Sequence, residues 1–225
     1  MHHSKEDYLK AIWHLGGRKE RVASKALIGR LGVQAPSVTD MLGRLAKEEL
    51  IEYEPYKGCI LTEKGREACL NLVRSHEIWE VFLVRHLGYR LAEAHAEADL
   101  LEHATSERLM ERLDHFLDYP VTCPHGARVP RPGATKDARK LLPLSDVPAG
   151  DCAQVCRIEE EAELLDYLER CGLSLEDKIQ VLAQSDFGGP LHLKVSNANR
   201  KTARELHLSQ RAAEMIFVET IKGAR

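Results

Sequence analysis

The 225-residue sequence predicts a mainly α-helical protein with an N-terminal winged helix-turn-helix, a helical middle region and a small C-terminal SH3-like β-barrel. Three observations predict this fold class. Apolar residues recur at helical spacing through most of the first 119 residues. A tract rich in proline and glycine then fills 120–150. Several short apolar runs, each of strand length, close the chain.

Three helices and a hairpin are expected at the N-terminus, where each boundary has a local signal. The first helix starts at Ser4, with Asp7 at its third position as in a capping box. The second is capped by Ser24 and stops at Gly32, and the third has Pro36 in its first turn. The expected ranges are 4–15, 23–32 and 33–50 for the helices and 50–62 for two short strands. This order of elements is that of a winged helix.

The middle region is expected to hold three further helices, and the last third of the chain short strands. Thr62 caps the first of these helices, and Pro120 ends the last. Their ranges are 63–88, 90–104 and 106–119. Beyond the linker, a helix at 162–173 lies among apolar runs at 153–158, 178–184, 191–195 and 215–221, which favours a small barrel.

Composition places the chain among globular proteins, because 44% of its residues are hydrophobic and 30% are charged. No apolar run approaches the roughly 18 residues of a membrane helix. The first residues, MHHSKEDYLK, lack the apolar segment of a secretory signal. The six cysteines show no C-x-x-C spacing, which favours free thiols in a reducing compartment. We therefore expect a cytoplasmic protein with no membrane partner.

The N-terminal helices are the candidate nucleic-acid interface. Residues 1–75 hold 13 Lys and Arg against 10 Asp and Glu, whereas the whole chain has a net charge of -3. In a helix-turn-helix, the start of the recognition helix enters the major groove. The residues expected to face bases are Gln34, Ala35, Pro36, Ser37, Thr39 and Asp40. Those expected to meet phosphates are Arg44, Lys47, Lys25 and, at the tip of the wing, Lys57. A winged helix used only for protein contacts is the alternative.

The stretch HAEADLLEH, residues 95–103, brings polar side chains to one face of an expected helix. Four candidate ligands fall within an arc of about 100°: His95, Asp99, Glu102 and His103. His76 and Glu80 are one turn apart on the preceding helix, and Asp7 lies on the first. Helical bundles build metal sites from side chains of several helices in this way. The alternative is a solvated charged face.

The order of these motifs resembles one family. A winged helix, His-x-x-x-Glu at 76–80, His-x-x-x-Asp-x-x-Glu-His at 95–103 and a proline-rich link to an SH3-like domain are similar to the diphtheria toxin repressor / manganese transport regulator family. The resemblance covers essentially the whole chain. It implies a homodimeric repressor that binds operator DNA when loaded with Fe(II) or Mn(II) and controls metal-uptake genes. The implied domains are 1–73 for DNA binding, 74–140 for metal binding and dimerisation, with the linker from 120, and 150–225 for the SH3-like domain.

Carried over by position, the resemblance implies two metal sites. One consists of Asp7, Asp99, Glu102 and His103, and the other of His76, Glu80 and His95. In some members the terminal domain supplies a carboxylate to the second site. Glu160, in the acidic run 159–163, is the candidate, and a solvated turn is the alternative. The stretch TCPHG at 122–126 is expected to be a structured turn, with a metal contact as its alternative.

The residue types at two positions favour Mn(II) over Fe(II). Iron-responsive members place methionine where Asp7 stands and cysteine where Asp99 stands. Hard oxygen ligands suit Mn(II), although a mixed oxygen and imidazole set also serves Fe(II). Many manganese-responsive members have a second acid where this chain has Lys10. We therefore expect two separated metal ions rather than a close pair.

The expected function is that of a metal-dependent regulator rather than an enzyme. Metal bound by Asp7 would pin the first helix to the helices that carry the other ligands, which would fix the spacing of two recognition helices in a dimer. A di-metal oxidase or hydrolase is the rival class, but the sequence shows no clear nucleophile or glycine-rich loop. Two further rivals are an Fe(II)-dependent regulator of the same fold and a winged-helix regulator that senses a non-metal signal.

Overall fold

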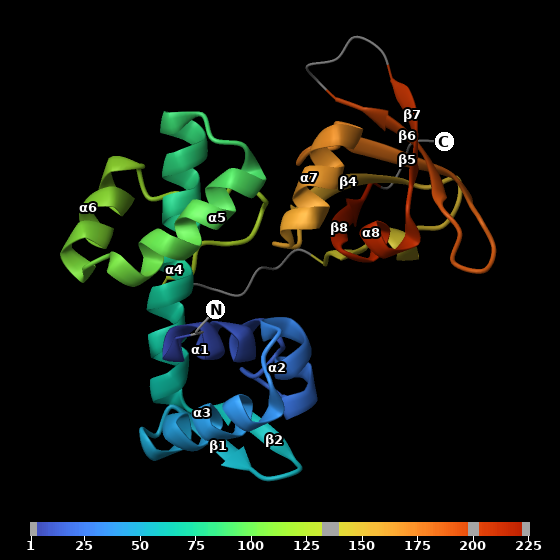
Figure 1. The fold of residues 1–225 in the computed structure, drawn as a ribbon. Coiled ribbons are helices and arrows are strands. Elements are labelled where there is room, and N and C mark those ends of the chain that lie inside the picture. The colour runs from blue at the N-terminus through green and yellow to red at the C-terminus, as the bar shows by residue number, and fades with distance from the viewer. Residues whose placement is uncertain (1–3, 132–139, 198–202, 222–225) are drawn as a thin grey trace. The chain divides into compact units, whose positions relative to one another are not determined.

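The computed structural model describes residues 4–131, 140–197 and 203–221 (Figure 1). These residues form two compact units. The first unit contains 4–76, 100–107 and 130–131. The second unit contains 77–99, 108–129, 140–197 and 203–221. The long helix α4 (Glu63–Leu87) contributes to both units.

The first unit is a winged helix, as the sequence predicts. Its elements are α1 (Lys5–His14), α2 (Ser24–Leu31), α3 (Ala35–Lys47), β1 (Ile51–Glu54), β2 (Gly58–Leu61), the start of α4 and the 3₁₀ turn η1 (Glu102–Ala104). The helices and the hairpin share one core, in which Ile12, Leu27, Leu42 and Leu45 are fully buried. This core holds α3 on the hairpin and leaves one side of α3 exposed.

Two helix starts in the first unit test the predicted caps. Ser4 and Asp7 form the expected capping box, with the Asp7 N–H 3.2 Å from Ser4 Oγ and the Ser4 N–H 2.6 Å from Asp7 Oδ2. The prediction that Ser24 caps α2 is wrong. Ala23 occupies the N-cap position, and Ser24 is already helical, so its hydroxyl is not placed to accept from the first turn. Gly32, with φ of 64°, ends α2 in the left-handed conformation.

The middle helices begin where the sequence predicts, but the fifth ends at Leu101 and the sixth at Phe116, each three residues early. Thr62 Oγ1 accepts the N–H of Gly65 (3.0 Å), which is the expected cap of α4. The expected helix 90–104 consists of α5 (Leu91–Leu101) followed by η1, and α6 (Glu107–Phe116) comes next. A 3₁₀ turn has about 3.0 residues per turn, against 3.6 in an α-helix. Glu102 and His103 therefore do not continue the α-helical face on which His95 lies.

The second unit contains a small helical core and a larger core under a sheet. Ile78 and Val81 of α4 pack with Met110 and Leu113 of α6 in the helical core. The sheet is antiparallel, with strand order β3-β8-β4-β5-β6-β7. Its elements are β3 (Leu142–Pro143), η2 (Leu144–Asp146), β4 (Cys152–Ile158), α7 (Ala162–Cys171), β5 (Lys178–Gln184), β6 (Leu191–Ser196), β7 (Arg204–Leu208), α8 (Gln210–Glu214) and β8 (Ile216–Thr220).

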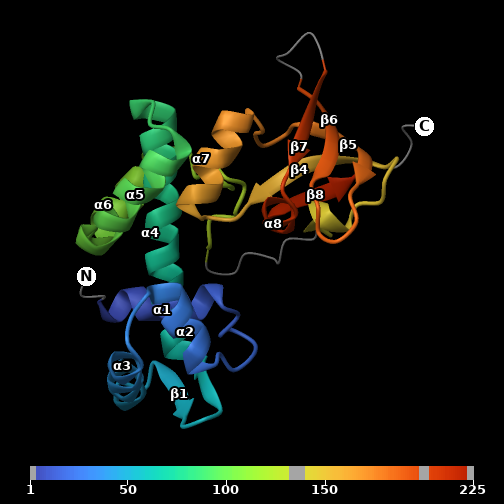
Figure 2. The same ribbon diagram turned by 45° about the vertical axis from the view of Figure 1, so that its right-hand side comes forward.

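The sheet and its helix agree with the predicted C-terminal domain, with three additions. α7 buries Leu164, Leu165 and Leu168 in the core of the sheet, and Figures 1 and 2 show it beside the strands. The sequence predicted β4, β5, β6, β8 and α7, but not β3, β7 or α8. β7 has the sequence RELHL, in which only Leu206 and Leu208 are apolar and only Leu208 is fully buried. Such a strand lacks the apolar run used to predict the others.

Two expectations drawn from composition concern membranes and thiols. Among the described residues, no helix has both the length and the apolar character needed to cross a bilayer. All six cysteines are free thiols, as the spacing predicted.

Candidate metal centre

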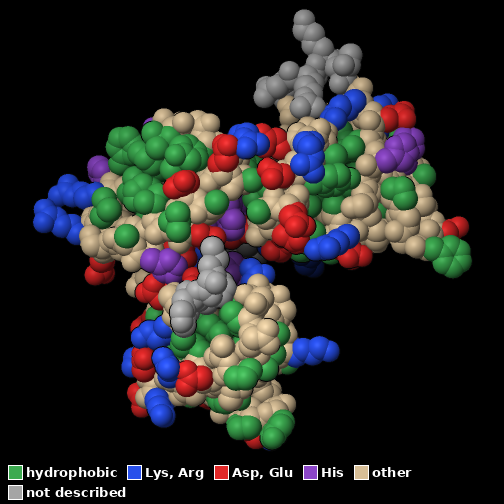
Figure 3. Space-filling model, in the orientation of Figure 1, with side chains coloured by type: hydrophobic (Ala, Val, Ile, Leu, Met, Phe, Trp, Pro, Cys, Tyr) green, Lys and Arg blue, Asp and Glu red, His purple; other side chains and the backbone are tan. Residues whose placement is uncertain are grey.

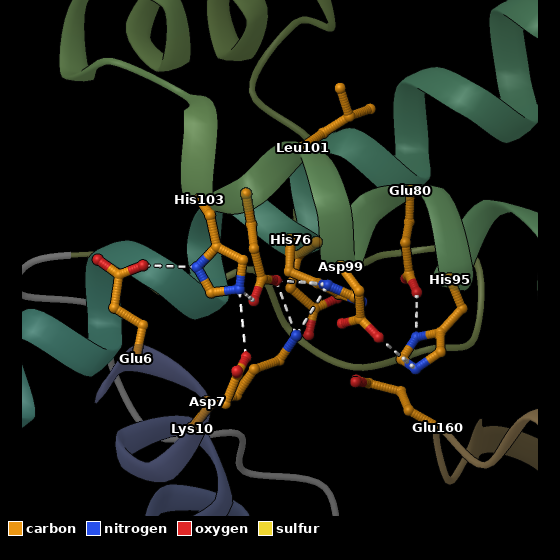
Figure 4. A network of polar contacts seen from close by, with 12 residues as sticks. Glu6, Asp7, Lys10, His76, Glu80, His95, Asp99, Leu101, His103 and Glu160 are labelled. Carbon is orange, nitrogen blue, oxygen red and sulfur yellow. Dashed lines mark hydrogen bonds and ion pairs between the residues drawn. The ribbon is translucent and has the colours of Figure 1, made fainter. Parts of the chain in front are cut away.

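In the part of the chain that the structure describes, each unit contains a cluster of polar side chains that includes potential metal ligands. The helix-one cluster, in the first unit, consists of Glu6, Asp7, Lys10, His76, Glu102 and His103. The buried cluster, in the second unit, consists of Glu77, Glu80, Cys123, His125 and Glu160. Figure 4 shows the helix-one cluster together with Glu80, His95, which contacts Glu80, and Asp99, which contacts His95.

Three of the four residues predicted for the first site meet in the helix-one cluster. Nε2 of His103 lies 3.2 Å from Asp7 Oδ1 and 3.6 Å from Glu102 Oε1. The side chain of Glu102 is almost completely buried, and those of Asp7 and His103 are about one-third exposed (29% and 30%). Two carboxylate oxygens therefore lie near the same imidazole nitrogen. This is a donor set that a divalent cation can hold together.

Asp7 has two separate roles in this geometry. Its Oδ2 accepts the Ser4 N–H in the capping box, so the carboxylate is held at the start of α1. Its Oδ1 faces His103. The local signal that starts α1 thus also fixes the direction in which the second oxygen points.

Glu6, which the sequence did not single out, orients His103. Glu6 Oε2 lies 2.5 Å from Nδ1 of His103, on the opposite side of the ring from Asp7. Burial lowers the pKa of His103, but the hydrogen bond to Glu6 and the charges of Glu102 and Asp7 outweigh it and raise the pKa above its usual value. With Nδ1 protonated toward Glu6, Nε2 is the nitrogen available to a metal, which is the arrangement of a carboxylate–histidine–metal triad.

Lys10 also enters the cluster. Its Nζ lies 2.7 Å from Glu102 Oε2 and 2.9 Å from Nδ1 of His76. Nδ1 of His76 is itself 2.7 Å from Glu102 Oε2. Within the first unit, the contacts of His76 Nδ1 are with Glu102 and Lys10. The grouping of His76 with Glu80 and His95 stays a prediction. The buried Glu102 carboxylate requires partners, and these two residues supply them.

The buried cluster is organised around His125. Nδ1 of His125 lies 2.8 Å from Glu80 Oε2, and its Nε2 lies 2.6 Å from Glu160 Oε1 and 3.2 Å from Cys123 Sγ. Glu77, Glu80, Cys123 and His125 are all buried, and each offers a ligand atom within 4.8 Å of the others. The predicted residues Glu80 and Glu160 thus lie in one site with the two side chains of the TCPHG stretch.

Three segments bring these side chains together. Glu77 and Glu80 lie on adjacent turns of α4. Cys123 and His125 lie in a tight turn, closed by hydrogen bonds from Cys123 N to Ala127 O (2.9 Å) and from Gly126 N to Cys123 O (3.0 Å). This is the structured turn that the sequence predicted.

The turn is fixed to the sheet at Gly126. Gly126 has φ of 89°, and a Cβ atom at this position would clash with the Cys156 carbonyl oxygen of β4. The Ile158 N–H, also of β4, donates to His125 O at 2.9 Å. Glu160 follows β4 directly, so the same contact between turn and strand aligns Glu160 with His125.

The electrostatics of the buried cluster favour a bound cation. Burial, reinforced by the charge of Glu160, raises the pKa of Glu77 to about 8. Burial also raises the pKa of the Cys123 thiol strongly. The pKa of His125 is raised as well, because Glu80 and the hydrogen bonds to Cys123 and Glu160 outweigh the effect of burial. Oε2 of Glu77 is buried and has no hydrogen-bond partner among the described residues. A divalent cation would give this oxygen a partner and stabilise the ionised carboxylate, so the donor set fits a metal ion.

His95 and Asp99 lie next to the buried cluster in the second unit. Nδ1 of His95 is 3.0 Å from Glu80 Oε1, so Glu80 has one oxygen toward His95 and the other toward His125. Asp99 Oδ2 is 3.8 Å from Nε2 of His95, and the Asp99 side chain is half exposed. The predicted pairing of Glu80 with His95 is therefore present.

The sequence assigned no metal role to Glu77 and treated a metal contact of Cys123 and His125 only as an alternative. The available signal was Cys-x-His within a proline- and glycine-containing turn, a spacing that places a thiol and an imidazole on one side of a turn. Their partners on α4 are more than forty residues away along the chain. No local periodicity connects a turn with a distant helix.

The predicted DNA-facing residues lie on the exposed side of α3. Gln34 is its N-cap residue, and side chains from Ala35 to Lys47 that were predicted to face DNA are exposed. Asp40 forms an ion pair with Arg44 (2.8 Å), and Lys57 forms one with Glu54 at the wing (2.6 Å). Asp40 therefore neutralises one of the cations predicted to meet phosphate. Lys25 is exposed at the start of α2.

Comparison with known protein families accounts for nearly the whole chain. Residues 1–59 match the iron-dependent repressor N-terminal DNA-binding domain, 62–131 match the iron-dependent repressor metal-binding and dimerisation domain, and 142–220 match the FeoA domain. The chain belongs to the diphtheria toxin repressor / manganese transport regulator family. Members of this family are metal-dependent transcriptional repressors and not enzymes, as the sequence predicted.

Individual relatives respond to different metals. MntR of Oceanobacillus iheyensis is 30% identical over 151 residues, which cover 67% of this chain and 97% of that protein. The iron-dependent repressor IdeR of Mycobacterium tuberculosis is 28% identical over 191 residues, which cover 78% of this chain and 82% of that protein. A manganese-dependent transcriptional repressor in complex with manganese is 34% identical, with a TM-score of 0.86, over 97% of this chain and all of that one.

Proposed function

We propose that this chain is a cytoplasmic, homodimeric, Mn(II)-dependent repressor. It binds operator DNA and controls genes for manganese and iron uptake. The observation that carries the proposal is the helix-one cluster. Asp7 belongs to α1 of the winged helix, while Glu102 and His103 belong to η1, more than ninety residues later. A divalent ion held by these three residues ties the DNA-binding helices to the turn that follows α5.

The proposed ligands fall into two sites. The helix-one site uses Asp7, Glu102 and His103, with Asp99 as a fourth ligand as the family resemblance implies. The buried site uses Glu80, Cys123, His125 and Glu160, with Glu77 beside them. His95 and His76 support the carboxylates Glu80 and Glu102 by hydrogen bonds. The proposed domains are 1–73, 74–140 and 150–225. Asp7 of the helix-one site lies in the first of these, the DNA-binding domain.

Donor chemistry supports Mn(II) first and Fe(II) second. The helix-one site offers oxygen and imidazole donors, which suit Mn(II). The buried site adds the Cys123 thiol, which binds Fe(II) or Zn(II) more strongly than Mn(II). MntR and the manganese-dependent structural relative support Mn(II), and IdeR supports Fe(II) as the alternative.

The helical part of the second unit supports the homodimer. Large apolar side chains are exposed there, including Leu87 (55%), Leu109 (45%) and Phe116 (60%). Figure 3 shows hydrophobic side chains gathered over these helices. Exposed apolar patches of this kind mark protein interfaces. A dimer presents two α3 helices, and operator half-sites about 34 Å apart require a fixed distance between them.

The proposal makes metal and DNA binding reciprocal. Metal favours the DNA-binding arrangement by its higher affinity for that state, and DNA must raise metal affinity by the same factor. On the DNA side, the start of α3 from Gln34 to Asp40 faces bases, while Arg44, Lys47, Lys25 and Lys57 meet phosphates.

The test is operator binding by the full chain against free Mn(II), Fe(II) and Zn(II) under anaerobic conditions. We expect binding to appear with Mn(II), to require more Fe(II), and to disappear with a chelator. DNA binding that is indifferent to the chelator would contradict the proposal and favour a regulator of a non-metal signal.

A further inference from the structure

The carboxylate of Glu102 has two different sides in the helix-one cluster. Oε1 faces His103 Nε2 (3.6 Å), which also faces Asp7. Oε2 faces Lys10 Nζ (2.7 Å) and His76 Nδ1 (2.7 Å). One side of the carboxylate therefore points to the proposed metal ligands, and the other side holds an ammonium group from α1 (Figure 4).

The Lys10 side has the properties of a cation site that the chain fills itself. The side chains of Glu102 and His76 are 1% exposed, and that of Lys10 is 13% exposed. The ammonium contacts a carboxylate oxygen and an imidazole nitrogen, which are both typical donors for a divalent ion. A buried carboxylate left without a cation is costly, so Lys10 keeps Glu102 and His76 in place whether or not metal is bound.

We propose that Lys10 is a permanent cation that occupies one of two cation positions around Glu102, an inference that rests on the proposed helix-one metal site. It limits the helix-one cluster to one divalent ion, bound on the Oε1 side between Asp7 and His103. It also keeps α1 in contact with η1 in the metal-free protein, so that metal binding adds a second link to an existing one.

The experiment counts Mn(II) ions bound per protomer of the full chain, by equilibrium dialysis and metal analysis, in Lys10→Met and wild type. Methionine keeps the length of the side chain and removes the charge. We expect one more Mn(II) per protomer in Lys10→Met than in wild type, and a lower melting temperature without metal that added Mn(II) restores. Lys10→Arg, which keeps the charge, should bind the wild-type number.

Lys5→Met is the matched control, because Lys5 lies on the same helix and pairs with Glu48 (2.6 Å) at the surface, where both side chains are nearly half exposed. It should leave the ion count unchanged. If Lys10→Met does not fold without metal, Lys10→Gln keeps a hydrogen-bond donor for Glu102 and should show the same gain. An unchanged count in the folded neutral variant would overturn the role of Lys10. If Asp7→Asn does not reduce Mn(II) binding in the Lys10 wild-type background, the helix-one site itself is wrong, which is a different failure.

Discussion

In the proposed helix-one site, His103 would bind metal through Nε2, because Glu6 contacts the other ring nitrogen, Nδ1 (2.5 Å). Glu6→Ala should therefore lower the Mn(II) affinity of the helix-one site by about 10–100-fold, the usual loss for a partner of a ligating histidine. Glu6→Gln should recover part of this loss, because its amide oxygen still accepts from Nδ1. Calorimetric titration measures both variants. The control is Glu20→Gln, which removes an exposed charge between α1 and α2. Equal Mn(II) affinities of Glu6→Ala and Glu20→Gln would refute the role of Glu6.

Glu77 gives the metal-free protein a predictable pH dependence. Its folded pKa is about 8, against 4.5 for the unfolded side chain. The folded state therefore holds a proton that the unfolded state has lost between these values, and stability falls as pH rises through this window. Glu77→Gln removes this loss, so its stability advantage over wild type should grow from pH 5 to pH 8 and then level off. Chemical denaturation in the presence of a chelator measures it.

Glu67→Gln is the control for this pH dependence, because Glu67 is exposed on the same helix. It should show no such growth. An advantage of Glu77→Gln that is equal at pH 5 and pH 8 would contradict the raised pKa.

At the scale of elements, the turn 122–128 depends on its contact with β4. Gly126→Ala should both strain a left-handed residue, at a cost of about 1–2 kcal/mol, and push the turn away from Cys156. We expect the free energy of unfolding to fall by more than this backbone cost alone. We also expect weaker metal binding at the buried cluster. Gly188→Ala is the matched control, since Gly188 also has a positive φ (69°) but no atom within 4 Å of a Cβ. Equal effects of the two substitutions on stability and metal affinity would show that the contact with β4 is unimportant.

Elements were predictable where the residues that define them are neighbours in sequence. Ser4, Asp7 and Thr62 cap helices through contacts three residues away. The apolar runs at 153–158, 178–184 and 191–195 form β4, β5 and β6, as predicted. The prediction failed where geometry changes within a motif. HAEADLLEH was treated as one helical face, but α5 ends at Leu101 and η1 turns Glu102 and His103 toward α1.

At the scale of the whole molecule, the predicted site was limited by sequence distance. Asp7, Glu102 and His103 could be grouped only through a family resemblance, because α1 and η1 are far apart in the chain. Cys123 and His125 lie in a turn, where no periodicity signals a ligand, and their partner Glu160 depends on how β4 aligns with that turn. The sequence indicates which side chains can act as metal ligands. Which of them contact one another is known only from the folded structure.

In the proposed function, a metal ion is coupled to the DNA-binding helices through Asp7. Couplings between two sites are typically about 1–3 kcal/mol, or about 5–150-fold in affinity. The substitution Asp7→Asn is suited to this question, because the amide oxygen can still accept the Ser4 N–H and keep the start of α1 while the negative charge is lost.

The most direct measurement is therefore operator affinity as a function of free Mn(II), by fluorescence anisotropy, for wild type and Asp7→Asn. We expect Asp7→Asn to remain folded, to require at least about 5-fold more Mn(II) for half-maximal DNA binding, and to gain less DNA affinity at saturating Mn(II). Identical Mn(II) midpoints and identical operator affinities in the two proteins would contradict this coupling.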